Sequence, residues 1–232
     1  MTRGYIFDYG GTLDTGGQHW GMAIWHVYER HGVPVTEAQY REAYVYTERI
    51  LGRQPIIKSD DTFRITLETK IRLQMEFLGV NGESDRRAVA DDLYERTRTV
   101  TAESRRVLRS LKDQDLPMVL VSNFYGNISV VLGEFGFDGL FQTVIESAVV
   151  GIRKPDPRIF LLGVEALGLK AEEVSVVGDS LEKDIIPAHK AGCRTVWLSG
   201  EGWTPTSHNG DCPFGAMADR VIRSLDELLE KE

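Results

Sequence analysis

The chain has 232 residues, of which 42% are hydrophobic, and this length allows one large globular domain or a domain with a substantial insert. Its formal charge of −8 argues against a nucleic-acid partner, because phosphate backbones are bound mainly by clustered lysine and arginine. No stretch approaches the roughly 18 apolar residues of a membrane span, and the amino terminus lacks a secretion signal, so we expect a cytoplasmic protein without a membrane partner.

The first predicted element is a short apolar strand that starts at Tyr5 and ends at the carboxylate of Asp8. An apolar run bounded by glycine is typical of a buried parallel strand, and open α/β sheets bind ligands at the carboxyl ends of such strands. Gly10 and Gly11 allow the backbone to turn tightly and to present its amides to an ion or phosphate, while Thr12 adds a hydroxyl. An ordinary Asx-turn after a strand is the alternative.

A helical segment follows the hinge at Gly16. Four amphipathic helices are expected, with apolar stripes that start at Trp20, Tyr40, Phe63 and Val89. Thr36 and Gln39 form a capping box for the second helix, and the fourth helix is expected to start near Ser84. The short connections suggest a small bundle, in which the aromatic stripes are interpreted as packing.

From about residue 101 the pattern becomes an alternation of helices and strands. Helices are predicted around residues 105–112, 127–135, 157–167 and 180–191, and strands at 117–122, 143–146, 174–178 and 195–198. This order predicts a parallel sheet covered on both faces. Residues 200–217 are predicted to form a loop that could border a site. Cys193 and Cys212 are interpreted as packing residues because two cysteines are too few for a disulfide framework.

The fold class predicted from this order is α/β. We expect a Rossmann-like parallel-sheet core formed by residues 1–15 and 98–232, with an α-helical cap formed by residues 16–97.

Polar residues stand where the predicted strands end. Asp8, Ser122 and Asp179 each follow an apolar strand, Lys154 precedes a proline in a loop, and Asp184 follows shortly after Asp179. Each has a plain alternative, namely a helix cap, a solvated charge or a turn. Together they would place carboxylates with little counter-charge at one sheet edge, where a hard divalent cation such as Mg²⁺ is the usual compensation.

These motifs resemble the four motifs of the haloacid dehalogenase superfamily of hydrolases. The corresponding residues are Asp8-Tyr-Gly-Gly-Thr12, then Ser122, then Lys154-Pro155, then Gly178-Asp-Ser with Asp184. The helical insert is similar to the mobile cap of members such as phosphoglycolate phosphatase and β-phosphoglucomutase. The resemblance covers essentially the whole chain.

The resemblance implies a role for each matching residue. Asp8 would be the nucleophile that becomes an aspartyl-phosphate, Ser122 would bind the phosphoryl group, and Lys154 would balance its charge. The implied Mg²⁺ ligands are Asp8, the carbonyl of Gly10, Asp179, and Asp184 as a ligand or close neighbour. The remaining substrate-binding positions are Gly11, Thr12 and Asn123.

Gly10 departs from the pattern of the superfamily's phosphatases, which carry there a second aspartate that protonates the leaving group and then activates water. General acid–base help is worth roughly 10²–10⁴ in rate, or about 3–5 kcal/mol. Three outcomes stay open. The substrate could have a good leaving group, a cap residue could substitute, with His19 favoured over His26, or the protein could bind without turnover.

Two further activities have weaker support. Tyr9 suggests a dehalogenase, but in dehalogenases of this superfamily the tyrosine lies two residues after the nucleophile. Enzymes that cleave carbon–phosphorus bonds use a cap lysine, and Lys58 and Lys70 are both expected on solvated helix surfaces. The prediction is therefore a Mg²⁺-dependent phosphatase acting on a small phosphorylated metabolite, as a monomer or homodimer. A catalytically weak phosphometabolite-binding protein is the alternative.

Overall fold

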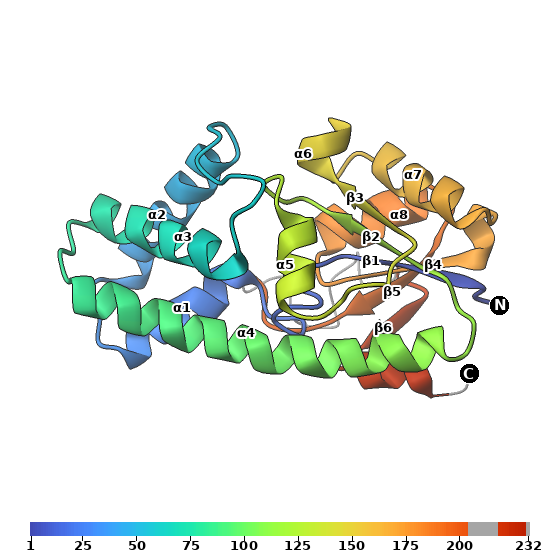
Figure 1. Ribbon diagram of the computed structural model, residues 1–232, viewed down its shortest axis with the longest axis horizontal. Coiled ribbons are helices and arrows are strands. Elements are labelled where there is room, and N and C mark those ends of the chain that lie inside the picture. The colour runs from blue at the N-terminus through green and yellow to red at the C-terminus, as the bar shows by residue number, and fades with distance from the viewer. Residues whose placement is uncertain (204–217, 231–232) are drawn as a thin grey trace.

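The computed structural model describes residues 1–203 and 218–230. Figure 1 shows a bundle of helices beside a sheet that is flanked by further helices, with one long helix running under both. In the described part of the chain, no helix combines the length and the hydropathy that a membrane span needs.

The sheet has six parallel strands in the order β3-β2-β1-β4-β5-β6. Their bounds are β1 Gly4–Phe7, β2 Met118–Ser122, β3 Thr143–Glu146, β4 Val174–Gly178, β5 Arg194–Leu198 and β6 Arg220–Ile222. Every residue of β1, β2 and β4 is buried, as expected for strands covered on both faces. The α/β fold class predicted from the sequence is confirmed.

Alternate residues of the central strand face two different apolar layers. Ile6 packs in a cluster with residues of α7, Arg158–Leu167, and α8, Ile186–Lys190. Phe7 packs in a second cluster with residues of α5, Ile128–Glu134, and with the end of the long helix α4, Glu83–Lys112. Helices therefore cover both faces of the sheet, and α6, Ser147–Val150, follows β3 at its carboxyl end.

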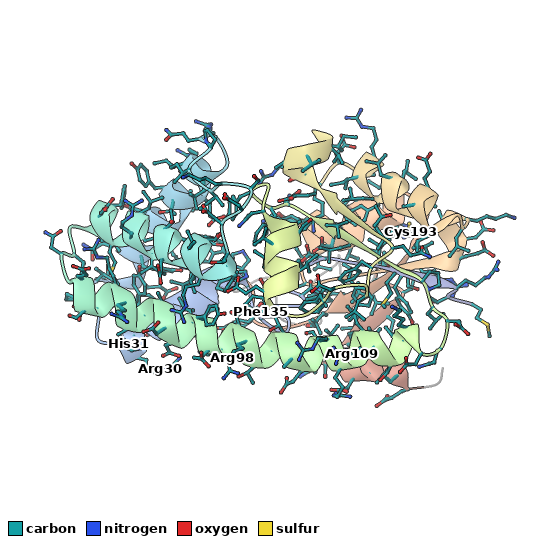
Figure 2. The ribbon with its side chains drawn as sticks, viewed as in Figure 1. Arg30, His31, Arg98, Arg109, Phe135 and Cys193 are labelled. Carbon is teal, nitrogen blue, oxygen red and sulfur yellow. The ribbon has the colours of Figure 1, made fainter. Side chains whose placement is uncertain are left out.

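Helices α1, Trp20–Arg30, α2, Glu37–Leu51, and α3, Phe63–Leu78, form the insert after β1. The predicted capping box is present, since Gln39 and Thr36 bond each other's backbone N–H groups. The end of α1 is tied to α4, because Arg30 Nη1 and His31 Nε2 each lie 3.0 Å from a carboxylate oxygen of Asp92 (Figure 2).

Helix α4 is continuous over 30 residues, Glu83–Lys112, so the prediction of two separate helices was wrong. No glycine or proline interrupts this stretch. The buried stripe does continue, but it passes through Thr97, Thr101 and Ser104. The hydroxyl of Thr101 donates to the Thr97 carbonyl at 2.7 Å, and that of Ser104 donates to the carbonyl of Leu13 at 2.8 Å. Because these residues are polar, hydrophobic periodicity alone could not show the continuity.

The predicted loop at residues 200–217 lies mostly outside the described residues, as does Cys212. Its first residues contact the insert. The ring of Trp203 lies 4.8 Å from that of Tyr44, and Arg41 donates to the Trp203 carbonyl at 2.7 Å. Cys193 is buried in the core, as predicted (Figure 2).

Candidate active site

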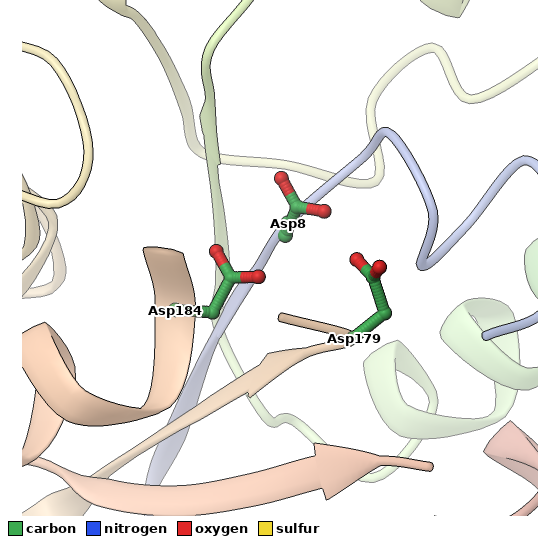
Figure 3. A group of neighbouring side chains, drawn as sticks. All are labelled: Asp8, Asp179 and Asp184. Carbon is green, nitrogen blue, oxygen red and sulfur yellow. The ribbon is translucent and has the colours of Figure 1, made fainter. Parts of the chain in front are cut away.

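Three carboxyl groups converge at the carboxyl edge of the sheet. Asp8 follows β1, Asp179 follows β4, and Asp184 lies on the short π-helix Leu181–Ile185 that comes next. One oxygen atom of each lies within 4.8 Å of the others. Figure 3 shows the three side chains pointing toward one another from three different segments. The structure thus brings together the aspartates that the sequence placed at strand ends.

Two glycines make this convergence possible. Gly11 has φ of +102°, which favours glycine, and a Cβ atom there would overlap the carboxylate of Asp179. A Cβ atom at Gly178 would overlap the side chain of Asp184. Each glycine therefore lets the backbone approach an acidic side chain more closely than any other residue would allow.

Lys154 is the ammonium group at the centre of the carboxylates. It is 5% exposed, and its Nζ donates to Asp8 Oδ1 and, at 2.7 Å, to Asp184 Oδ1. The side chain of Asn123 holds the Lys154 backbone from both sides, with an accepted and a donated hydrogen bond of 3.0 Å each. Burial alone would lower the pKa of Lys154, but the charges of Asp184 and Asp8 outweigh it and raise the pKa.

Thr12 connects the first strand's turn to the end of β4. Its hydroxyl donates to Asp8 Oδ2 at 3.0 Å, lies 3.2 Å from Asp179 Oδ1, and accepts from the Asp179 backbone N–H at 3.1 Å. Since Thr12 is fully buried, it supports the two carboxylates from behind. Ser122 is also buried, at the end of β2, and neither residue is among those lining the cavity described below.

The cluster carries more negative than positive charge. Burial raises the pKa of Asp8 to about 6, with Lys154 lowering it and Asp184 raising it further. Burial also raises the pKa of Asp179, and the charges of Asp8 and Asp184 add to the effect. Three carboxylates share one ammonium group here, and all the ligand atoms offered are oxygens. This donor set could hold a hard divalent cation.

A cavity of about 140 Å³ lies between these residues and the insert. On the sheet side it is lined by the three aspartates, Gly10, Lys154 and Asn123. Helices α1, α2 and α3 contribute Trp20, Tyr44, Glu48 and Lys70 to the opposite wall. Since a water needs about 10–15 Å³ on the same measure, the cavity has room for a small organic molecule.

Asp14 is a cavity residue that our sequence analysis did not select. Its Oδ1 accepts from the Gly11 backbone N–H at 2.7 Å, and its Oδ2 accepts from Trp20 Nε1 at 2.8 Å. Burial raises the pKa of Asp14 to about 7. In the sequence, Asp14 is simply an acidic residue at the end of the first motif, and no local pattern marks it as buried. Whether that carboxyl group is buried depends on Trp20, which comes from the next helix.

Position 10 has free space on its cavity side. A Cβ atom at Gly10 would meet only Trp20 Cδ1, at 4.0 Å. The space that an aspartate would occupy there is therefore open, and it borders the indole that hydrogen-bonds Asp14.

The two histidines weighed as substitutes differ in position. His19 lines the cavity, where its Nδ1 accepts from the Gly21 backbone N–H at 3.0 Å and caps α1. Burial lowers the pKa of His19 to about 4. His26 lies 2.9 Å from Glu201 and 3.1 Å from Glu29 and does not line the cavity. The structure thus places the favoured histidine at the cavity, in a mainly neutral form.

The expectation that both cap lysines are solvated was wrong for Lys70. Lys58 is exposed and lies in a loop, whereas Lys70 is 8% exposed, lines the cavity and lies 2.8 Å from Glu48. Lys70 belongs to a buried polar stripe of α3, together with Thr66 and Gln74. A stripe of polar residues carries no hydrophobic signal, so sequence reasoning placed it on the surface.

Tyr9 points away from the cavity. It is fully buried, and its ring lies edge-on to those of Phe124 at 5.8 Å and Phe137 at 6.4 Å. Its neighbours Asp8 and Gly10 line the cavity and Tyr9 does not.

Three kinds of comparison relate this chain to known proteins: a family model, similar sequences and solved structures. A family model of haloacid dehalogenase-like hydrolases matches residues 2–192. Glyceraldehyde 3-phosphate phosphatase of Pyrococcus furiosus is 37% identical over 93 residues, which are 40% of this chain and 37% of that protein. Phosphoserine phosphatase of Thermus thermophilus is 47% identical over 58 residues, which are 25% of this chain and 23% of that protein. The chain therefore matches less than half the length of either relative.

Solved structures show the same fold. One is the crystal structure of a dehalogenase with an intermediate complex. Its alignment with this protein includes 98% of this chain and 95% of the dehalogenase chain, with 21% sequence identity and a TM-score of 0.63. At this identity the likeness concerns the fold alone. Because the family model spans most of the chain, the protein belongs to the haloacid dehalogenase-like hydrolases.

Proposed function

We propose that the protein is a Mg²⁺-dependent phosphatase that acts on a small phosphorylated metabolite through an aspartyl-phosphate at Asp8. The observation that carries this proposal is the convergence of Asp8, Asp179 and Asp184 in one cavity, where Lys154 Nζ donates to Asp8 and Asp184. The phosphatase names of the matched relatives agree with it.

Each residue's proposed role follows from its chemistry. Asp8 attacks phosphorus, and Lys154 favours its ionised form and neutralises charge on the phosphoryl oxygens. Asp8, Asp179, Asp184 and the carbonyl of Gly10 would hold Mg²⁺, which supplies electrostatic stabilisation of the phosphoryl group. Asn123, which lines the cavity, is proposed to contact the phosphoryl group, and Ser122, Gly11 and Thr12 are proposed to support this end of the site from behind. Helices α1 to α3 would close over the substrate as a cap, with residues 16–97 as the cap domain.

Gly10 limits the range of substrates. Without an acid at this position, esters with good leaving groups should react faster than ordinary alkyl phosphates. The same feature favours a second candidate function, a protein that binds a phosphometabolite with little turnover. The buried orientation of Tyr9 gives no support to a dehalogenase, and the ion pair of Lys70 with Glu48 gives none to a Schiff base, which needs a neutral amine.

The test is phosphate release with Mg²⁺ over sugar, nucleotide, acyl and aromatic phosphates, including glyceraldehyde 3-phosphate and phosphoserine. We expect turnover that Asp8→Asn reduces about 10⁴-fold or more, because the nucleophile is lost. Asp60→Asn, which changes an exposed aspartate of the insert, is the matched control and should retain activity. Binding without release would favour the second candidate, and halide release that survives EDTA would favour a dehalogenase.

A further inference from the structure

The wall of the cavity opposite the aspartates contains a buried ammonium group. Lys70 of α3 is 8% exposed, and its Nζ lies 5.4 Å from the ring centroid of Tyr125 and 5.9 Å from that of Trp20. Burial alone would lower the pKa of Lys70, but Glu48 outweighs this effect and keeps the pKa well above its ordinary value. A cation held between aromatic rings therefore faces the space in which the substrate's non-reacting end must lie.

The one carboxylate on this wall is already engaged. Oε1 of Glu48 lies 2.8 Å from Lys70 Nζ, and its Oε2 accepts from the hydroxyl of Tyr125 at 2.9 Å. Lys70 therefore has Glu48 as its ionic partner and Tyr125 as a neighbour, and its ammonium group carries three N–H donors. Lys70 is thus a cationic donor on this wall that suits an acceptor on the ligand, beside the hydroxyl of Tyr44 and the imidazole of His19.

Two more cations stand at the rim. Arg153, in the loop before Lys154, and Lys183, on the π-helix, both line the cavity and are exposed. Neither forms an ion pair with any residue that the structure describes. Besides the four aspartates and Lys154, the cavity is therefore lined by three further cationic groups and one further carboxylate, that of Glu48.

We propose that Lys70, supported by Arg153 and Lys183, binds a carboxylate on the substrate, so that the substrate class is a small phosphorylated carboxylic acid. The proposal rests on the proposed function, since it takes the phosphoryl group to lie at Asp8. The cavity of about 140 Å³ has room for a small organic chain between the two acidic groups. A neutral hydroxyl-bearing end would leave Arg153 and Lys183 without an ionic partner on the substrate, whereas Lys70 already has Glu48.

A matched pair of ligands that cannot be hydrolysed tests this inference directly. The two are 3-phosphonopropanoate and propylphosphonate, which share a carbon–phosphorus bond and a three-carbon chain and differ in the terminal carboxylate. Their dissociation constants are measured by calorimetry on the full chain with Mg²⁺ at low ionic strength. We expect the carboxylate to bind at least tenfold tighter, which corresponds to about 1.4 kcal/mol.

Variants assign the effect to the named residues. Lys70→Gln should reduce the ratio of the two constants to less than about threefold, whereas Lys58→Gln, which removes an exposed charge from the same insert, should leave the ratio unchanged. If Lys70→Gln fails to fold because Glu48 is left buried and unpaired, the double variant Glu48→Gln/Lys70→Gln removes both charges. Lys183→Gln and Arg153→Gln change exposed positions and should each lower the ratio about twofold or more.

The inference is overturned if the two phosphonates bind equally well, or if Lys70→Gln and Lys58→Gln keep the same ratio. These results do not depend on turnover. Phosphate release from p-nitrophenyl phosphate, which has no carboxylate, reports on the proposed function separately. An active enzyme with equal phosphonate binding would refute only the carboxylate site, and an inactive protein with the expected ratio would refute only the phosphatase.

Discussion

Gly10 and Asp14 together decide which proton donors border the reacting group. The expected acid is absent at position 10, and the Trp20 indole that borders this position donates to a buried carboxyl, Asp14, whose other oxygen accepts from Gly11. The sequence showed the absence at once. It could not show the buried carboxyl, because Asp14 is shielded by an indole six residues further along the chain.

Restoring the acid should change the substrate preference. A Cβ atom at Gly10 would meet only Trp20 Cδ1, at 4.0 Å, so the first side-chain atom of Gly10→Asp meets no clash. We expect phosphate release from an alkyl phosphate to rise about 10²–10⁴-fold and release from p-nitrophenyl phosphate to rise much less, because a good leaving group needs no proton. Gly10→Asn has the same shape without the proton and is the control. Equal acceleration of both substrates would contradict the assignment.

Asp14 should make stability depend on pH. Its folded pKa of about 7 lies above the ordinary value of 3.8, so the folded state binds the extra proton between these values. The stability from this group is therefore present below about pH 4 and is lost as the pH rises through about 7. Asp14→Asn removes this titrating group. The free energy of unfolding of the variant minus that of the wild type should therefore increase by up to about 4 kcal/mol from pH 4 to pH 8. Urea unfolding in EDTA measures this, and a difference independent of pH would refute the prediction.

Helix α4 joins the insert to the sheet layer without a break. Its buried stripe includes Val89 and Leu93 in the insert and Val107 and Leu108 under the sheet, with small polar residues between them. The prediction that the core resumes at residue 98 places the domain boundary inside this helix. Any motion of the proposed cap must therefore bend α4 or occur in the segment between β1 and α1.

A proline in the middle of α4 tests this coupling. Thr99→Pro changes an exposed residue, removes a backbone hydrogen bond and should lower the free energy of unfolding by about 3 kcal/mol. It should also raise KM, because the cap wall of the cavity is displaced. Glu83→Pro places the same residue at the first helical position after Gly82, where proline is tolerated, and should change both quantities little. Similar effects of the two prolines would show that α4 does not position the cap.

At the scale of the whole molecule, charge is distributed unevenly. The net charge is −8, and the aspartate cluster is buried at the sheet edge, where water screens its repulsion poorly. A divalent cation that neutralises this cluster should therefore stabilise the entire fold.

Mg²⁺ should raise the melting temperature in a concentration-dependent manner. At 100 times its dissociation constant the expected stabilisation is about 2.7 kcal/mol, or roughly 5–10 °C for a chain of this length. Thermal unfolding with Mg²⁺ and with EDTA measures the difference. Asp179→Asn should abolish most of it, whereas Asp60→Asn should preserve it. A shift that persists in Asp179→Asn would place the ion elsewhere.

The sequence by itself determined the alternation of strands and helices, the capping box of the second insert helix, the positions of Asp8 and Asp179 at strand ends and that of Lys154 in a loop. These features depend on residues close together in the chain, through hydrophobic periodicity, capping and the shared carboxyl edge of parallel strands. They therefore needed no knowledge of what packs against them.

Only the tertiary structure decided the continuity of α4, the burial of Asp14 and the inward orientation of Lys70. Each depends on a partner that no local sequence pattern identifies. The partner is the Leu13 carbonyl for Ser104, the Trp20 indole for Asp14, and Glu48 of another helix for Lys70. Polar side chains carry no periodic signal of burial, because their burial becomes favourable only once such a partner satisfies them.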